Sequence, residues 1–249
     1  MASRSEISNA KNVANFNVLL AFILSYLDIF KPSRAAIEYA SLQAVAGNAK
    51  KSMESVNDAS SADNGAKAAR KVAFAPLNKL ITRVINSVRS TDTPTEVDNQ
   101  VRTLVRKLRG TRATPKKSEE EKKALAAEGK VVNEISESQL GFDDRLENFD
   151  KLIKLLAGIS LYAPNETELK LMELTGVYNN LNALNKVAVS TELNLGKARN
   201  LRQEVLYEDK TGLVDLALDT KSYIRSLFGA TSKEYRQISK LKFINIKKK

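Results

Sequence analysis

The 249-residue sequence contains neither cysteine nor histidine. Without cysteine the chain has no disulfide framework and no thiolate chemistry, and without histidine it lacks the commonest general base and the commonest metal ligand. These two absences exclude zinc sites, histidine-based catalytic triads and di-iron sites of the Glu-x-x-His type. Glycine and proline are also scarce, with ten and five residues, which favours long helices over a fold rich in turns.

Apolar residues make up 43% of the chain, enough for a substantial core, and they recur at helical spacing along most of it. This pattern predicts an all-α protein built of two similar up-and-down helical bundles. The expected domains are residues 1–109 and residues 142–249. Residues 110–141 are expected to form a charged linker that carries a short exposed helix. Packing of the first helices of both halves into one body is the alternative arrangement.

The second half of the chain repeats features of the first half in the same order. Asn15-Phe16 parallels Asn148-Phe149, and a proline follows the first helix of each half, at Pro32 and at Pro164. The further matches are Ile37, Leu42 and Val45 with Leu169, Leu174 and Val177, and Gln100-Val101 with Gln237-Ile238. Because the matches keep their order and include both proline breaks, they indicate an internal duplication.

Residues 15–30 form a long apolar run near the N-terminus. The run is shorter than the roughly 20 residues that a membrane-spanning helix needs. It predicts a central helix that is buried nearly all round, in a cytoplasmic protein. A secretory signal is the alternative, although the run ends at Asp28 and Lys31-Pro32 with no prompt cleavage site of small residues. The polar residues 57–65 predict a loop between the second and third helices.

The third helix is expected at about residues 66–89, with Val72, Leu77, Ile81 and Val88 among the residues at core spacing. Pro76 is expected to kink or split this helix. Near the C-terminus, residues 213–228 predict a helix, and Ser232 is expected to cap a short last helix that ends at about residue 240.

Four segments of the chain carry a resemblance to other proteins. They are SEEEKKALAAEGK at 118–130, FDDRLENFDKLIKLL at 142–156, YAPNETELK at 162–170 and SLFGATSKEYRQISKLKF at 226–243. These segments resemble an uncharacterised group of duplicated helical proteins of Bacteroidota, whereas residues 1–89 match that group only loosely. The resemblance implies a duplicated helical fold. It implies no activity, because none is established for the group.

The formal net charge of +11 is concentrated in residues 64–117, which hold thirteen lysine and arginine residues against three acidic ones. Clustered cations without acids are what binding to a phosphate backbone requires, although charge runs on helices are more often solvated surfaces. Phe74 is the only aromatic residue in this region, so stacking on the bases of a single strand is not supported.

Two functions follow as hypotheses. The first is a non-enzymatic structural or interaction protein, a helical scaffold or assembly subunit whose partner is another protein or a second copy of the chain. The alternative is a protein that binds nucleic acid through the phosphate backbone without sequence specificity. The residues expected to contact phosphate lie on the non-core sides of the third and fourth helices or in the segment after them. They are Lys79, Arg83, Arg102, Arg106, Arg109, Arg112, Lys116 and Lys117.

A cluster of carboxylates opens the second half, at Asp143, Asp144, Glu147 and Asp150. Such a cluster could hold a cation or serve as acid and base, but acidic residues at the start of a helix are more often there to favour its dipole. No glycine-rich phosphate loop and no nucleophile elbow occurs in the sequence. We therefore expect no enzymatic role, no cofactor, no metal site and no small-molecule substrate, and we do not expect a membrane partner.

Overall fold

The computed structural model describes residues 4–111 and 141–246, and between them residues 118, 120, 123, 124 and 127. All regular secondary structure in these residues is helical, as the sequence predicts. The internal part of the expected linker, including most of its short helix, lies outside the described residues.

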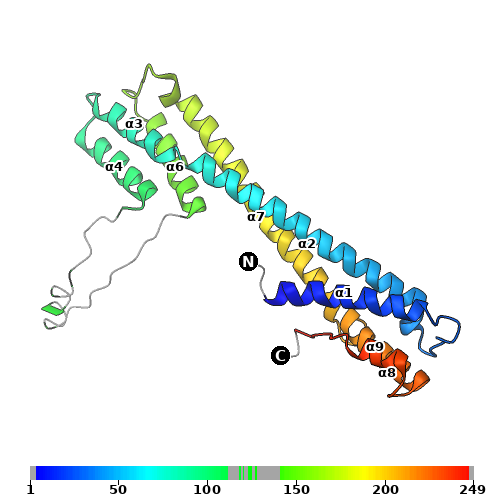
Figure 1. The fold of residues 1–249 in the computed structure, drawn as a ribbon. Coiled ribbons are helices and arrows are strands. Elements are labelled where there is room, and N and C mark those ends of the chain that lie inside the picture. The colour runs from blue at the N-terminus through cyan, green and yellow to red at the C-terminus, as the bar shows by residue number, and fades with distance from the viewer. Residues whose placement is uncertain are drawn as a thin grey trace. The chain divides into compact units, whose positions relative to one another are not determined.

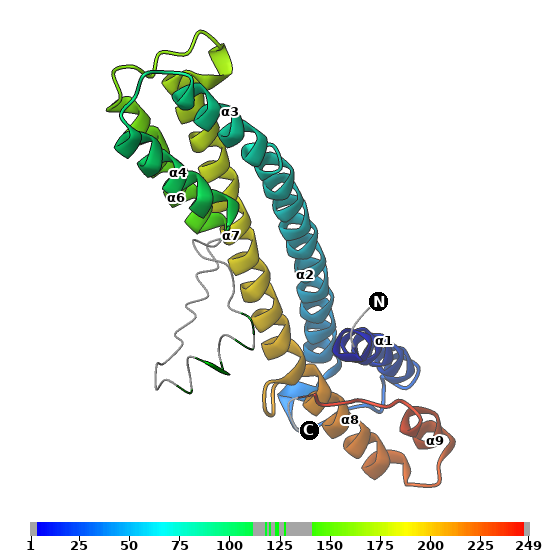
Figure 2. The ribbon, with the colours of Figure 1, turned by 90° about the vertical axis from the view of Figure 1, so that its left-hand side faces the viewer.

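The helices differ greatly in length (Figures 1 and 2). In chain order they are α1 (Arg4–Leu24), the 3₁₀ helix η1 (Ala35–Ile37), α2 (Tyr39–Phe74), α3 (Leu77–Arg89), α4 (Thr95–Arg109), α6 (Phe142–Ala157), the 3₁₀ helix η2 (Thr167–Leu169), α7 (Leu171–Tyr207), α8 (Leu213–Phe228) and α9 (Lys233–Ser239). Two of them dominate the chain, since α2 has 36 residues and α7 has 37.

The loop predicted at residues 57–65 is wrong, because these residues continue α2 without a break. Composition misled the prediction: the segment is polar, but one side of it packs. Val56 and the partly buried Ala59 form a small apolar cluster with Leu195 and Ala198 of α7. Tertiary packing of this kind outweighs the weak helix propensity of asparagine, serine and glycine. The predicted break at Pro76 does occur, and it separates α2 from α3.

The contacts of the chain define two compact units, and neither follows the predicted domains 1–109 and 142–249. Unit 1 comprises residues 1–64 and 190–249, and unit 2 comprises residues 65–189. Each unit therefore contains helices from both halves of the sequence. The physical reason is that α2 and α7 are each continuous, so the two ends of each long helix contribute to different cores.

Unit 2 is built around the strongly amphipathic α3 and α4. The buried side of α3 consists of Leu77, Ile81, Val84, Ile85 and Val88. Val101, Val105 and Leu108 are the buried side of α4, and α4 packs beside α6 (Figures 1 and 2). Gly110 ends α4 in the left-handed region, with φ 67°, where glycine has no side chain to clash.

Unit 1 has a polar seam along one side of α1. The amide of Asn12 donates to the Tyr207 hydroxyl (3.1 Å) and to the backbone oxygen of Ile244 (2.8 Å). The Tyr207 hydroxyl in turn donates to Asn9 Oδ1 (2.6 Å), and Ile244 N donates to Asn12 Oδ1 (3.0 Å). These bonds satisfy the buried amides and hold the irregular C-terminal segment against α1.

The same seam carries an ion pair whose protonation should affect stability. Arg202 is only 6% exposed and donates to both carboxylate oxygens of Glu6, at 2.6 and 2.7 Å. The hydrogen bond from Arg202 holds the pKa of Glu6 below its ordinary value of 4.5. Glu6 therefore stabilises the fold above pH 4.5, and this contribution is lost as the pH falls through its lowered folded-state pKa.

Replacing Glu6 by glutamine is expected to lower the free energy of unfolding at pH 7, because the buried guanidinium loses its countercharge. The difference between the parent and E6Q should stay constant from pH 7 down to the ordinary pKa of 4.5, and should shrink as the pH falls further, through the lowered folded-state pKa of Glu6. Chemical denaturation at several pH values measures this. A difference that stays constant over the whole range would contradict the role assigned to the pair.

The first helix is not central to the fold, contrary to the prediction. One side of α1 is buried through Phe16, Leu19 and Ile23, while the opposite side is exposed. In Figure 2 this helix is viewed nearly along its axis, with α8 and α9 below it. Of the helices described, none combines the length and the apolar character that crossing a membrane requires.

Candidate functional site

A groove with basic walls lies between α3 and α4 in unit 2. Its volume is about 370 Å³. Buried Ile85 and Val105 lie among its lining residues, together with polar and charged side chains of both helices. The polar lining consists of Thr82, Asn86, Arg89, Arg102, Arg106, Arg109 and Thr111.

Three of the predicted phosphate-binding residues, Arg102, Arg106 and Arg109, line this groove together. Their spacing of four and then three residues places them along one side of α4. Arg109 is held in place because its Nη2 donates to the Thr82 hydroxyl oxygen across the groove, at 2.6 Å. Arg106 is half-buried, and Arg102 and Arg109 are exposed.

Lys79 and Arg83 do not belong to this group. They line a different hollow of about 330 Å³ together with the carboxylates Glu168 and Glu173. Arg83 forms an ion pair with Glu168, so its charge is already compensated within the protein. The remaining predicted residues, Arg112, Lys116 and Lys117, lie outside the described residues. The structure therefore brings together three of the eight predicted cations and separates two.

Arg89 is a member of the groove that the prediction did not select. It lies at the end of α3, seven residues after Thr82, and therefore on the same side of that helix. The sequence holds the signal, because Thr82, Asn86 and Arg89 recur at helical spacing. What the sequence does not give is which side of α3 faces α4.

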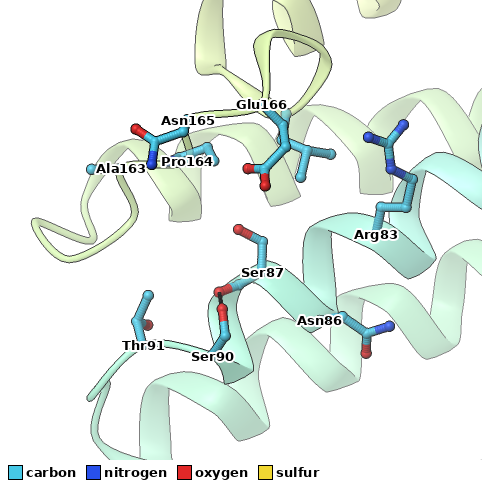
Figure 3. Close-up of a pocket in the computed structure, with 10 residues that line it drawn as sticks. Arg83, Asn86, Ser87, Ser90, Thr91, Ala163, Pro164, Asn165 and Glu166 are labelled. Carbon is cyan, nitrogen blue, oxygen red and sulfur yellow. Dashed lines mark hydrogen bonds between the residues drawn. The ribbon is translucent and has the colours of Figure 1, made fainter.

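A third hollow lies between the end of α3 and the segment that leads into η2, with a volume of about 470 Å³ (Figure 3). Its hydroxyl groups serve local structure. Ser90 Oγ donates to the backbone oxygen of Ser87 (2.8 Å), and Thr91 Oγ1 donates to that of Val88 (2.6 Å), which satisfies carbonyls at the end of α3. Glu166 also lines the hollow, but no hydrogen bond between it and these hydroxyls is seen.

Three of the four carboxylates at the start of α6 have a side-chain partner. Asp143 Oδ1 accepts from the amide of Asn185 (2.7 Å), Glu147 pairs with Lys151, and Asp150 pairs with Lys154 (2.6 Å). The hydrogen bond that Lys151 donates to Glu147 lowers the pKa of Glu147, and the hydrogen bond that Lys154 donates to Asp150 raises the pKa of Lys154. In the described part of the chain, no three acidic residues form a group that could hold a metal ion.

The exposed side of α1 is unusually apolar for a helix surface. Its residues follow helical spacing, at Ile7, Ala10, Ala14, Val18 and Ala21, and we call them the outer face of α1. Ile7 is 57% exposed and Val18 is 43% exposed. Val18 and Ala21 belong to the apolar run at residues 15–30 that predicted a central helix. An apolar surface on both sides of a helix gives this pattern even where one side is exposed.

Comparison of the chain with protein-family models, with curated proteins and with solved structures finds no match. The resemblance at residues 118–130, 142–156, 162–170 and 226–243 therefore stays a prediction.

Proposed function

We propose that the two halves of this chain are copies of one helical unit, and that the chain is a non-enzymatic assembly subunit that pairs with a second copy of itself through the outer face of α1. The observation that carries the proposal is that this face is apolar, whereas the same face of the corresponding helix in the second half is charged.

The case for duplication begins with local backbone geometry. The residues that precede η1 and η2, Arg34 and Glu166, have φ/ψ of −92°/113° and −67°/116°. The residues that follow, Glu38 and Lys170, have −64°/150° and −64°/145°. Both turns lead directly into a long helix, and corresponding residues of the two turns are 132 positions apart in the sequence. Agreement in a short irregular segment is more informative than agreement between helices, which share one geometry everywhere.

Burial follows the same correspondence. Phe16, Leu19 and Ile23 of α1 correspond to Phe149, Leu152 and Leu156 of α6, and all six are buried. Later in each half, Val88 and Val101 correspond to Ile224 and Ile238, which are buried as well. The two copies would therefore use matching residues for their cores, with each unit taking its early helices from one copy and its late helices from the other.

The correspondence provides an internal control for the outer face of α1. Four of its residues, Ala10, Ala14, Val18 and Ala21, correspond to Asp143, Glu147, Lys151 and Lys154 of α6. On α6 this face is the charged surface expected of a helix in water. On α1 every one of these charges is replaced by an alanine or a valine. If the outer face of α1 contacted only solvent, nothing would favour apolar residues there over the charged residues that α6 has at the corresponding positions.

A second copy of the chain fits the outer face better than an unrelated partner, because the face is complementary to itself. Its residues are spaced symmetrically about Ala14. Two α1 helices that cross antiparallel on a two-fold axis at Ala14 would oppose Ile7 with Ala21 and Ala10 with Val18. Each larger side chain then meets an alanine, and helix axes can approach to roughly 8–10 Å. Lys11 is exposed beside this face, and the same axis would oppose it with Asn17 of the second copy, not with itself.

The pairing is expected to be concentration-dependent, because one helix face is smaller than the roughly 800 Å² per partner of a standard stable interface. Sedimentation velocity over a concentration series should show a reversible monomer–dimer equilibrium. Val18→Glu should shift it to monomer at all concentrations, because the dimer would bury two carboxylates without partners.

Val72→Glu is the matched control. Val72 is 73% exposed on α2, so the same substitution adds the same charge to a surface outside α1. We expect V72E to dimerise like the parent. A parent that is monomeric throughout the series, or equal weakening by both substitutions, would refute the pairing. Circular dichroism of each variant verifies that the helices remain folded.

A further inference from the structure

We infer that the groove between α3 and α4 is an anion site that takes phosphate groups of a nucleic-acid backbone through Arg89, Arg102, Arg106 and Arg109. This inference goes beyond the proposed assembly, and it concerns a different unit of the protein from the outer face of α1.

The positive charge of the groove is not compensated by acidic residues in its lining. Four guanidinium groups line a groove of about 370 Å³, and none of its lining residues is acidic. Within the described residues, Arg89, Arg102 and Arg106 form no ion pair. Three arginines elsewhere in the described fold do have carboxylate partners: Arg34 pairs with Asp219, Arg83 with Glu168 and Arg202 with Glu6. Arg89, Arg106 and Arg109 lie in the last turns of α3 and α4, where cations favour the helix dipole. Arg102 lies outside the last turn, and like charges four residues apart, as at Arg102 and Arg106, destabilise a helix.

The donors in the lining of the groove also suit phosphate chemically. Guanidinium presents several N–H donors in one plane and binds phosphate oxygens in pairs, which makes arginine better suited to phosphate than a point charge. The hydroxyls of Thr82 and Thr111 and the amide of Asn86 add neutral donors to the same lining. The hydrogen bond from Arg109 to Thr82 fixes one guanidinium at the groove before any ligand arrives.

The row of arginines along α4 also has a length that suits a nucleic-acid backbone. Arg102 and Arg109 are seven residues apart, which corresponds to roughly 10 Å along α4 at 1.5 Å per residue. One strand of duplex DNA carries a phosphate about every 3.4 Å along its axis. The row of arginines therefore matches about three successive phosphates better than it matches one. None of the lining residues is aromatic, which favours contacts to the backbone over stacking on bases.

The test is fluorescence anisotropy of a labelled 20-base-pair duplex, titrated with the full chain at several salt concentrations. We expect binding at low salt that weakens with a log–log slope near −3, about −0.9 for each phosphate neutralised. The variant Arg102→Gln, Arg106→Gln, Arg109→Gln should bind at least about tenfold more weakly, with a slope closer to zero. Its glutamines keep good helix propensity, and circular dichroism verifies the fold.

The matched control removes the same charge elsewhere in unit 2, as Lys71→Gln, Lys79→Gln, Lys186→Gln, three exposed lysines outside the groove. This variant should stay within about threefold of the parent, since it keeps the phosphate contacts that set the salt slope. Equal losses in both variants would overturn the assignment to the groove, because net charge alone would then explain binding.

Inorganic phosphate and tripolyphosphate serve as competitors in a separate arm. Displacement of the duplex by tripolyphosphate at far lower concentration than by phosphate would support several adjacent phosphate positions. Binding of tripolyphosphate without any binding of the duplex would overturn the assignment to nucleic acid, as would absence of duplex binding by the parent at low salt.

Discussion

Replacing Phe74 by alanine is expected to lower the free energy of unfolding by about 3–5 kcal/mol, the usual range for a buried phenylalanine. Phe74 is 2% exposed and lies at the end of α2, where it meets α6. Its ring packs edge-to-face on Phe142, with 4.9 Å between centroids, and Arg145 lies over its face at 5.3 Å. Alanine would remove both contacts and leave a cavity in the unit 2 core.

Val72→Ala is the matched control, two residues earlier on the same helix. Because Val72 is 73% exposed, its truncation should change stability by no more than about 0.5 kcal/mol. Urea denaturation followed by circular dichroism measures both variants. Similar midpoints for V72A and F74A would mean that the end of α2 does not pack on α6 as described.

The same two residues show how far the sequence could predict the core. Helical periodicity placed Val72 on the core side of its helix together with Leu77, Ile81 and Val88. The last three are buried, but Val72 is not. The error lies in the helical phase, because at about 100° per residue Val72 points roughly 140–180° away from Leu77, Ile81 and Val88. Phe74 is in phase with these three residues across the break at Pro76, and it is buried. The register of the core therefore continues from α2 into α3, and Val72 does not belong to it.

The all-helical fold and most individual helices could be predicted because their signals are local. α8 (Leu213–Phe228) has its predicted bounds, and Ser232 accepts a hydrogen bond from Tyr235 N (3.0 Å) as the predicted N-cap of α9. The division into units could not be predicted, because it depends on whether residues 57–65 continue a helix or turn back. The continuation of the helix is stabilised by packing between Val56 and Leu195, which are far apart in the sequence.

The candidate site shows the same limit. The sequence located the basic region and selected Arg102, Arg106 and Arg109, which do line one groove. It could not show that Glu168, distant in sequence, compensates Arg83, nor that Arg89 faces α4. Charge density along a chain identifies the region that holds a surface, but pairing with acidic residues elsewhere decides which of its cations are left for a ligand.

Expressing the two halves of the chain as separate polypeptides should distinguish the interleaved units from two independent bundles. In this experiment the chain would be divided between residues 127 and 128. The N-terminal half then carries α3 and α4, and the C-terminal half carries α6 and the part of α7 that completes the same core. Without its partner, the N-terminal half would leave Phe74, Leu77 and Leu108 without the side chains of α6 that cover them.

Each half alone is therefore expected to be largely unfolded, or to fold only by associating with itself, because the core it can bury is too small to offset its conformational entropy. Mixing the halves at equal concentration should restore the helical signal of the intact chain and yield a one-to-one complex by light scattering. The predicted domains 1–109 and 142–249 require the opposite result. If both halves fold as monomers and do not associate on mixing, each core is built from one half of the sequence. The division in which each unit contains helices from both halves would then be wrong.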